Sequence, residues 1–207
     1  NTISFSTMIG NNASNYGIGL YFATHSSNSI VSSYIWGALN GVYYDDYTYY
    51  NTISLSTMIG NGSSGSAWAG VHIDNASSYN TITQSSMRGV EHGVIITNSG
   101  TGACIGNLIS QSTITSNSAG YSALFITNAS SNTILDSYIQ GSTATLIYAS
   151  TGTVIGDSVL IATNTVGNAI GATNGIVNLT VTSSTLKGGA NGAGLYMARG
   201  NSGIITL

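Results

Sequence analysis

The decapeptide NTISLSTMIG at residues 51–60 repeats the first ten residues of the chain, NTISFSTMIG, with a single change at its fifth position. Looser copies start at Asn28 (NSIVSSYIWG), Asn80 (NTITQSSMRG), Asn107 (NLISQSTITS) and Asn132 (NTILDSYIQG), and a degenerate copy starts at Asn178, shifted by one residue. The starts at residues 1, 28, 51, 80, 107 and 132 lie 23 to 29 residues apart. Segments that recur at this spacing are typical of a solenoid, in which each repeat is one turn of a coil.

Each copy has the same internal order of residue types. After the opening Asn, an apolar residue stands at the third position, Ser at the sixth and a second apolar residue at the eighth, and Gly usually follows. Later in each coil comes a second short apolar run, such as VHI at residues 71–73 or LFI at residues 124–126. Short runs that are bounded by Gly, Asn and Ser, without a helical period, predict β-strands and no helix.

A coil of this length cannot bury its own apolar face, so like positions must stack on like. We therefore expect an all-β, single-stranded, right-handed parallel β-helix of about eight coils with roughly 25 residues each, in one domain over residues 1–207. Residues 157–177 supply the coil between the copies at Asn132 and Asn178. Equivalent Ile residues form an interior column, and Ser residues sit where the coils bend. The opening Asn residues form a ladder of stacked amides at a turn: Asn1, Asn28, Asn51, Asn80, Asn107 and Asn132.

The composition narrows the classes of partner. Only 4% of the residues are charged and proline is absent, which suits continuous β-ladders with a surface of Asn, Ser, Thr, Gly and Tyr. The only basic residues are Arg88, Lys187 and Arg199, too few for a nucleic-acid-binding stripe or an electrostatic membrane anchor, and no apolar run reaches membrane-spanning length. The single cysteine, Cys104, is expected in the core. We expect no metal and no cofactor.

The repeat Asn-Thr-Ile-Ser-x-Ser-x-Ile/Met-x-Gly-Asn resembles the parallel β-helix repeat of pectate-lyase-like proteins, and the resemblance covers nearly the whole chain. It implies the fold. It implies no single activity, because this superfamily includes polysaccharide lyases and hydrolases, phage tailspikes, bacterial surface adhesins and carbohydrate-binding scaffolds. The polygalacturonase motifs, paired Asp followed by His-Gly and Arg-x-Lys, are absent from this chain.

Enzymes of this superfamily carry clustered carboxylates beside Arg, Lys or His on one outer face. Aligning the second runs places Asp45 and Asp74 at the same step of adjacent coils, about 5 Å apart, with His72 on the outward face of the strand. This trio suits general acid–base chemistry or a metal. The alternative, which we favour, is that these are the few charges that a low-charge surface retains. Asp45, Asp74 and His72 are therefore catalytic candidates only if the chain is an enzyme.

Aromatic residues are prominent at the outward positions of the second runs. These positions are predicted to hold Tyr21, Tyr43, His72, Ile95, Phe125, Ile147 and Tyr196. Aromatic rings on an outer sheet stack on sugar rings, which makes ligand-binding candidates of four residues: Tyr21, Tyr43, Phe125 and Tyr196. The alternative is that the rings only pack against one another as a ladder on the sheet.

The sequence favours a non-enzymatic structural or adhesive protein that is secreted or carried on the cell surface. The chain starts inside a repeat and ends in IITL at residues 204–207, without a capping segment. We expect either a segment of a longer repeat protein or a subunit that self-associates through its open ends into a filament. The alternative function is a carbohydrate-binding or polysaccharide-degrading β-helix, tailspike-like or pectate-lyase-like, with glycans as partners.

Overall fold

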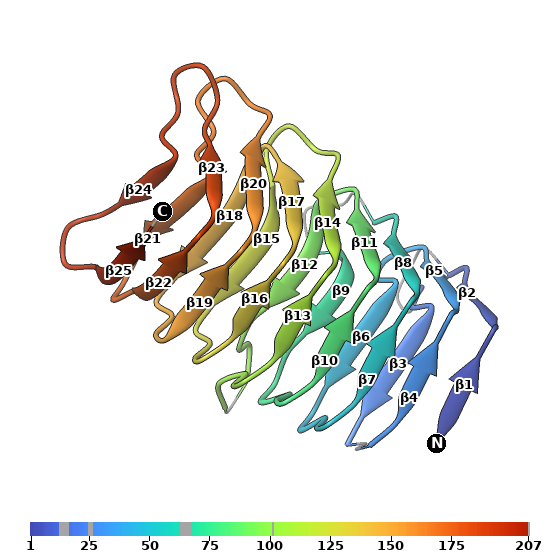
Figure 1. Cartoon of the computed structure of the whole chain (residues 1–207). Helices are drawn as coiled ribbons and strands as arrows, with labels where there is room; N and C mark the ends of the chain where they lie inside the picture. Colours follow the sequence, from blue (N-terminus) through green and yellow to red (C-terminus); the bar gives the residue numbers. More distant parts are fainter. Residues whose placement is uncertain (13–16, 25–26, 63–67, 101, 207) are drawn as a thin grey trace.

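The computed structural model describes residues 1–12, 17–24, 27–62, 68–100 and 102–206, which form 25 β-strands and, within these ranges, no helix. The strands build three parallel sheets that stack coil upon coil along the chain (Figure 1). Each coil contributes one strand to each sheet in the order A, B, C. The predicted all-β solenoid of about eight coils is confirmed. Since no helix is present in the described ranges, none is long and apolar enough to cross a membrane.

Sheet A has nine strands, and the first apolar residue of each repeat lies in it. Its strands are β1 (Thr2–Ser4), β4 (Ser29–Val31), β7 (Thr52–Ser54), β10 (Thr81–Thr83), β13 (Leu108–Ser110), β16 (Thr133–Leu135), β19 (Thr153–Gly156), β22 (Asn178–Thr182) and β25 (Ser202–Thr206).

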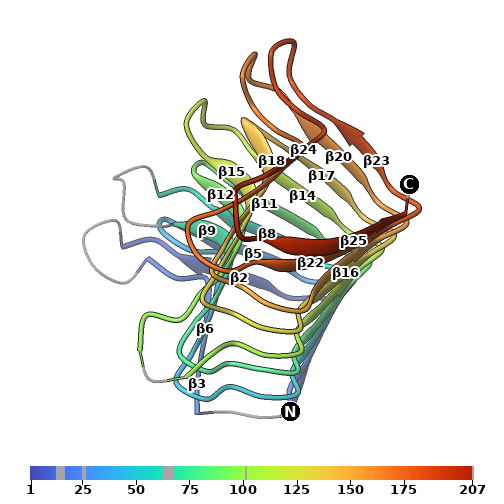
Figure 2. The same cartoon turned by 90° about the vertical axis from the view of Figure 1, so that its left-hand side faces the viewer.

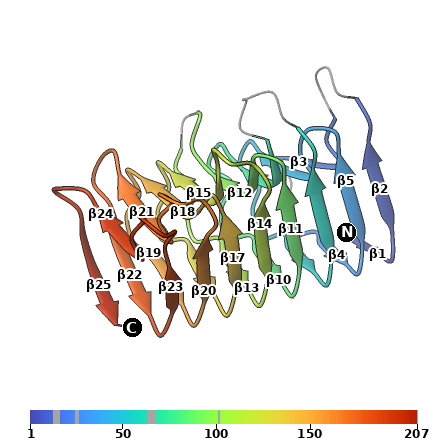
Figure 3. The ribbon, with the colours of Figure 1, turned by 90° about the horizontal axis from the view of Figure 1, so that it is seen from above.

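Sheet B has eight strands, which follow one another in chain order when seen from above (Figure 3). Its strands are β2 (Thr7–Gly10), β5 (Tyr34–Gly37), β8 (Thr57–Gly60), β11 (Ser86–Gly89), β14 (Thr113–Ser116), β17 (Tyr138–Gly141), β20 (Val159–Ala162) and β23 (Thr185–Lys187).

Sheet C also has eight strands and corresponds to the second apolar run of each repeat. Its strands are β3 (Leu20–Ala23), β6 (Val42–Asp45), β9 (Ala69–Ile73), β12 (His92–Ile96), β15 (Ser122–Thr127), β18 (Thr143–Tyr148), β21 (Ile170–Thr173) and β24 (Leu195–Met197).

The core is built from identical positions that lie directly above one another. In sheet A, Ile3 pairs with Ile30 and Ile30 with Ile53, and the same register continues through Ile82, Ile109, Ile134 and Ile155. From Ile30 onward these side chains are at most 1% exposed. Fully burying one such side chain is worth about 1.5–3 kcal/mol, so the column is a main source of stability.

Each bend between sheets A and B uses the same two residues. The first has a left-handed backbone with φ between 47° and 51°: Phe5, Ser32, Leu55, Gln84, Gln111, Asp136, Asp157 and Ser183. The second is the repeat Ser. The Ser33 amide donates to Ser56 Oγ over 3.0 Å, while Ser33 Oγ donates back to the Val31 carbonyl over 2.9 Å. The bend therefore satisfies its own polar groups from coil to coil.

The repeat Asn residues form a ladder at the entry to sheet A. Asn51 Nδ2 donates to Asn80 Oδ1 over 3.0 Å, and the Asn51 backbone amide donates to the same oxygen over 3.0 Å. Equivalent side-chain bonds join Asn1 to Asn28, Asn28 to Asn51, Asn80 to Asn107 and Asn107 to Asn132. Buried amides that bond to one another in this way hold the register of six coils.

The coil expected over residues 157–177 starts earlier than the sequence suggested. Thr133 pairs with Val154 and Ile134 with Ile155, so Thr153 occupies the position of Asn132. The prediction was wrong because this coil has Thr153 where the six preceding coils have Asn, and its sheet A strand reads TVIG. The shift of one residue at Asn178 is confirmed, since Thr153 pairs with Leu179.

The connections from sheet B to sheet C differ greatly in length. Residues 117–121 join β14 to β15, and residues 163–169 join β20 to β21, whereas Ser142 alone joins β17 to β18. The long connections rise beyond the ends of the sheets (Figures 1 and 2). Short connections between long ones leave hollows on the surface, and the candidate sites lie at these places.

Candidate functional site

The outer face of sheet C carries one continuous row of residues in register. The row runs through Tyr21, Tyr43, His72, Ile95, Phe125, Leu146, Gly171 and Tyr196. The prediction of Ile147 at an outward position was wrong, because Ile147 pairs with Ile126 and is fully buried. The observed register buries an Ile in the core and keeps the polar Tyr148 out of it.

Exposure along the row rises at both ends and falls in the middle. Tyr21 and Tyr196 are about half exposed, at 50% and 49%, whereas His72 is 9% exposed and Ile95 only 1%. Tyr43 and Phe125 are half-buried. The four candidate ligand-binding residues therefore do not form one continuous aromatic strip.

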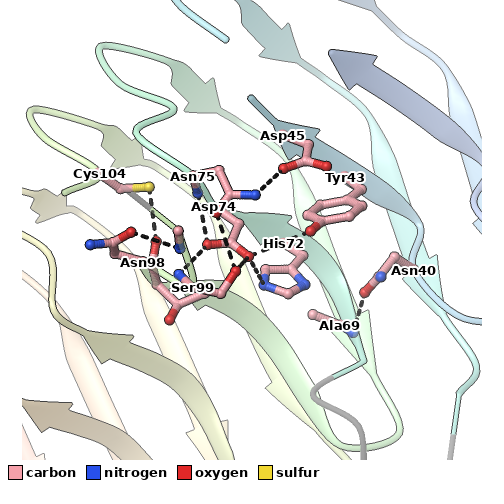
Figure 4. A network of polar contacts seen from close by, with 12 residues as sticks. Asn40, Tyr43, Asp45, Ala69, His72, Asp74, Asn75, Asn98, Ser99 and Cys104 are labelled. Atoms are coloured by element: carbon pink, nitrogen blue, oxygen red, sulfur yellow. Dashed lines mark hydrogen bonds and ion pairs between the residues drawn. The ribbon is translucent and has the colours of Figure 1, made fainter. Parts of the chain in front are cut away.

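The first half of the row is a stack of rings tied to carboxylates (Figure 4). The ring centroid of Tyr43 lies 5.6 Å from that of Tyr21, and the Tyr43 ring stacks on the His72 ring with their centroids 4.7 Å apart. The Tyr21 hydroxyl donates to Asp45 over 2.9 Å, and the Tyr43 hydroxyl donates to Asp74 over 3.5 Å. Each tyrosine thus reaches the carboxylate at the carboxyl end of the sheet C strand of the next coil.

Asp74 is 2% exposed and is surrounded by donors. Its oxygens accept from the Asn75 amide over 2.7 Å, from the Ser99 amide over 2.8 Å and from the Ser99 hydroxyl. Asn75 Nδ2 donates to Asp45 over 2.5 Å, which links the two carboxylates (Figure 4). Asp74 therefore fixes the turn that follows β12 onto the turn that follows β9.

His72 is a neutral imidazole in this cluster. Burial lowers its pKa to about 4, an effect that outweighs the nearby Asp74 carboxylate, which favours the charged form. Its Nε2 lies 3.9 Å from Asp74 Oδ2, and neither ring nitrogen has a hydrogen-bond partner among the described residues. The pKa of Tyr43 is raised, chiefly by burial and then by Asp45. At neutral pH both rings keep their uncharged forms.

A hollow of about 220 Å³ opens over the second half of the row. The His92 ring stacks on Phe125 at 5.5 Å and meets the Tyr121 ring edge-on at 5.2 Å. Tyr148 approaches Phe125 edge-on at 5.2 Å. The lining comprises His92, Gly120, Tyr121, Ser122, Phe125, Leu146 and Tyr148. Sequence reasoning missed Tyr121 and Tyr148, because Tyr121 precedes β15 and Tyr148 is the last residue of β18, so neither stands in the outward row. Their aromatic side chains in or next to the second apolar runs were the available signal.

The ring orientation in this hollow is fixed by the backbone. His92 Nδ1 lies 2.7 Å from the Ser122 carbonyl, so this nitrogen donates and carries the proton of the neutral ring. Burial lowers the pKa of His92, which keeps the ring neutral near pH 7. The hollow thus presents uncharged aromatic faces.

Positive charge and metal ligands are both scarce here. The three basic residues of the chain lie elsewhere: Arg88 is in β11 and Lys187 is in β23, both in sheet B, and Arg199 follows β24 near the end of the chain. Within the described ranges, no group of three or more His, Cys, Asp or Glu side chains is placed to hold a metal ion. Cys104 is buried, donates from Sγ to the Thr97 carbonyl over 3.0 Å, and has a pKa raised to about 12 by burial.

Solved structures show what this architecture is similar to. The chain superposes on the periplasmic alginate epimerase AlgG with a TM-score of 0.70 and 12% identity, over 92% of this chain and 47% of that one. It superposes on the Azotobacter vinelandii mannuronan C-5 epimerase AlgE4 A-module with a TM-score of 0.69 and 13% identity, over 98% of this chain and 57% of that one.

This chain is a right-handed parallel β-helix. The resemblance to the pectate-lyase-like fold is thereby confirmed. The β-helix spans about half the length of the solved structures that it matches, and identities near one in eight establish the fold alone. The Agl-KA catalytic domain is a further match, with a TM-score of 0.54 and 13% identity over 92% of this chain and 45% of that one. The sequence matches no protein-family model and no curated protein.

Proposed function

We propose that this β-helix is a carbohydrate-binding module of a polysaccharide-active protein, with the outer face of sheet C as its glycan surface. Two of the solved structures that share the fold are named as epimerases of alginate or mannuronan. These names favour the carbohydrate-binding alternative over the structural or adhesive function that the sequence first favoured. Self-association through the ends stays a prediction.

The aromatic hollow carries the proposal. Phe125 and His92 line it with stacked rings, Tyr148 stands edge-on to Phe125 and Tyr121 stands edge-on to His92. A sugar ring that enters therefore meets aromatic rings beside phenolic groups. Aromatic faces remove the apolar side of a sugar from water while polar groups fix its orientation. The surrounding turns bear no Lys or Arg, and the carboxylates of Asp45 and Asp74 accept hydrogen bonds from the first two tyrosines of the row. We therefore infer that this face takes neutral sugar units.

Binding fits the first half of the row better than catalysis. Asp45 accepts from the Tyr21 hydroxyl, from Asn75 Nδ2 and from the Asp46 amide, and Asp74 is enclosed by donors. A general base must reach the proton that it abstracts, whereas the oxygens of Asp74 are occupied by the protein itself. We therefore propose a structural role for Asp45, Asp74 and His72, which hold the outer face of sheet C in its conformation.

The proposed ligands are polymers of the cell envelope or its surroundings, so we also propose a location outside the cytoplasm. A matched structure is named as periplasmic, which supports this location.

Affinity electrophoresis through gels that contain neutral glucans, mannans or xylans, with alginate as an acidic comparison, tests the function. Phe125→Ala should weaken binding about fivefold, since stacking on one ring contributes about 1 kcal/mol and a tenfold change corresponds to about 1.4 kcal/mol. Tyr34→Ala is the control, because Tyr34 is an exposed aromatic residue that belongs to sheet B. Absence of binding to every polymer, or equal losses in the two variants, would contradict the proposal.

A further inference from the structure

Arg88 stands between two adjoining hollows on the outer face of sheet B, away from the aromatic row. The hollows measure about 210 and 350 Å³, and both are lined by Arg88 and Asn117. The larger one also meets Gln140 and Thr163. It exists because the single residue Ser142 joins β17 to β18, whereas residues 117–121 and 163–169 rise on either side.

The guanidinium of Arg88 is held in a fixed orientation. With the Asn117 amide oriented so that both groups are satisfied, the Asn117 oxygen accepts from Arg88 Nη2 over 2.6 Å and from Nε over 2.9 Å. Arginine has five N–H donors, so three remain. Two of these lie on the Nη1–Nη2 edge, which has the geometry that binds a carboxylate with two parallel hydrogen bonds.

No internal carboxylate neutralises this arginine. Among the residues that the structure describes, no Asp or Glu lies within ion-pair distance of Arg88, and its side chain is exposed. The rest of the lining is uncharged. Ile59, Val90 and Asn61 line the smaller hollow, and the polar residues Thr115, Ser116, Gln140 and Thr163 line the larger one.

The second basic residue of sheet B lies on the same outward row. Arg88 pairs with Thr115, and the register continues through Gln140 and Ile161 to Lys187. Four steps of about 4.8 Å place Lys187 about 19 Å from Arg88. Two of the three basic residues of a chain with net charge −3 therefore lie along one line.

We propose that this face binds an acidic saccharide, with the carboxylate of a uronate unit paired to the free edge of Arg88. Bidentate pairing on a planar fork suits a carboxylate. The amide and hydroxyl side chains of the hollows suit the hydroxyl groups of the adjacent sugar. A single fixed cation in a neutral lining suits one carboxylate, and it gives no footprint for the dense charge of a nucleic acid. The site lies on a different sheet from the aromatic hollow and does not depend on it.

Calorimetric titration with trigalacturonate tests the site, and the methyl-esterified trisaccharide serves as the uncharged ligand. Trigalacturonate should bind the unmodified protein more tightly than its ester. Arg88→Gln should weaken trigalacturonate binding at least tenfold and remove the preference over the ester. Arg199→Gln is the matched control, because Arg199 is exposed and follows β24, and it should bind like the unmodified protein.

Several outcomes would overturn the inference. They are equal binding of acid and ester, equal affinity in Arg88→Gln, or a loss in Arg199→Gln as large as in Arg88→Gln. Sodium sulfate or an oligoglutamate peptide that binds at Arg88 as tightly as trigalacturonate would overturn the saccharide assignment. The sheet C proposal is tested separately by neutral polymers and Phe125→Ala, so either proposal can fail alone.

Discussion

Replacing His72 with Phe should make the protein less sensitive to acid. His72 is buried, its ring stacks on Tyr43, and its pKa is lowered to about 4 from an ordinary value of 6.5 because burial disfavours the imidazolium. Phe keeps a flat ring of similar size at this position and removes two buried nitrogens that lack hydrogen-bond partners. The four donors around Asp74 are left in place.

The magnitude follows from proton linkage. Above pH 6.5 the imidazole is neutral in both states and its titration contributes nothing. As the pH falls below 6.5, the unfolded chain binds a proton that the folded chain refuses until about pH 4, and the free energy of unfolding falls by about 1.4 kcal/mol per pH unit. Between pH 7 and pH 5 the titration of His72 should therefore cost about 2 kcal/mol, a cost that is absent from the His72→Phe variant.

Urea denaturation at pH 7 and pH 5, for the unmodified protein and His72→Phe, measures this difference. The other titrating groups, including His92, are common to both proteins and cancel in the comparison. The unmodified protein should lose about 2 kcal/mol more than the variant on acidification. Parallel losses would refute burial as the dominant influence. A smaller loss of stability in the unmodified protein than in the variant would show that attraction between the imidazolium and Asp74 outweighs the effect of burial.

Three further predictions concern the frame and the thiol. Asn80→Ala should lower the free energy of unfolding by about 3 kcal/mol or more, because it leaves several buried donors and acceptors without partners. Asn1→Ala at the exposed end should lower it by under about 1 kcal/mol. The urea midpoints of the two variants measure the difference. Gly93→Ala should lower the free energy of unfolding by about 1–3 kcal/mol, since the new Cβ would lie 2.7 Å from Cγ2 of Ile114 in the next coil. Gly120→Ala should leave the stability unchanged, because its Cβ meets nothing within 4 Å. Thermal melting of the two variants measures the difference. Cys104 should react with a thiol reagent at pH 8 only after denaturation, because its pKa is raised to about 12; fast labelling of the native protein would contradict this.

The fold could be predicted from the sequence because each coil repeats the same physical solution. Asn51 and Asn80 bond to one another only if their coils are in register, and Ile53 and Ile82 share a dry interior only under the same condition. Polar and apolar columns therefore demand one arrangement. The start of the coil at Thr153 was not predicted, because this coil keeps the apolar column but lacks the Asn that marks the preceding starts.

The surface was less predictable, because loop length and strand register decide it. The alternation of apolar residues could not tell Leu146 from Ile147 as the outward side chain, since both are aliphatic and adjacent. Arg88 stood out in the sequence only as a rare cation, and its partner Asn117 lies in the next coil, in a connection whose course no pattern of residues indicates.

One connection links the two proposed sites. Residues 117–121 supply Asn117 to the Arg88 hollows on sheet B, and Gly120 and Tyr121 to the aromatic hollow on sheet C. The connection has this double role because its neighbours are short: residues 90–91 on one side and Ser142 on the other. The Asn and Ser columns hold the coils in register whatever the length of these connections, since none of the bonds in either column involves them. Surface recognition can therefore vary through connection length and outward residues while the coil beneath stays the same, which is why a fold shared with epimerases does not fix the ligand.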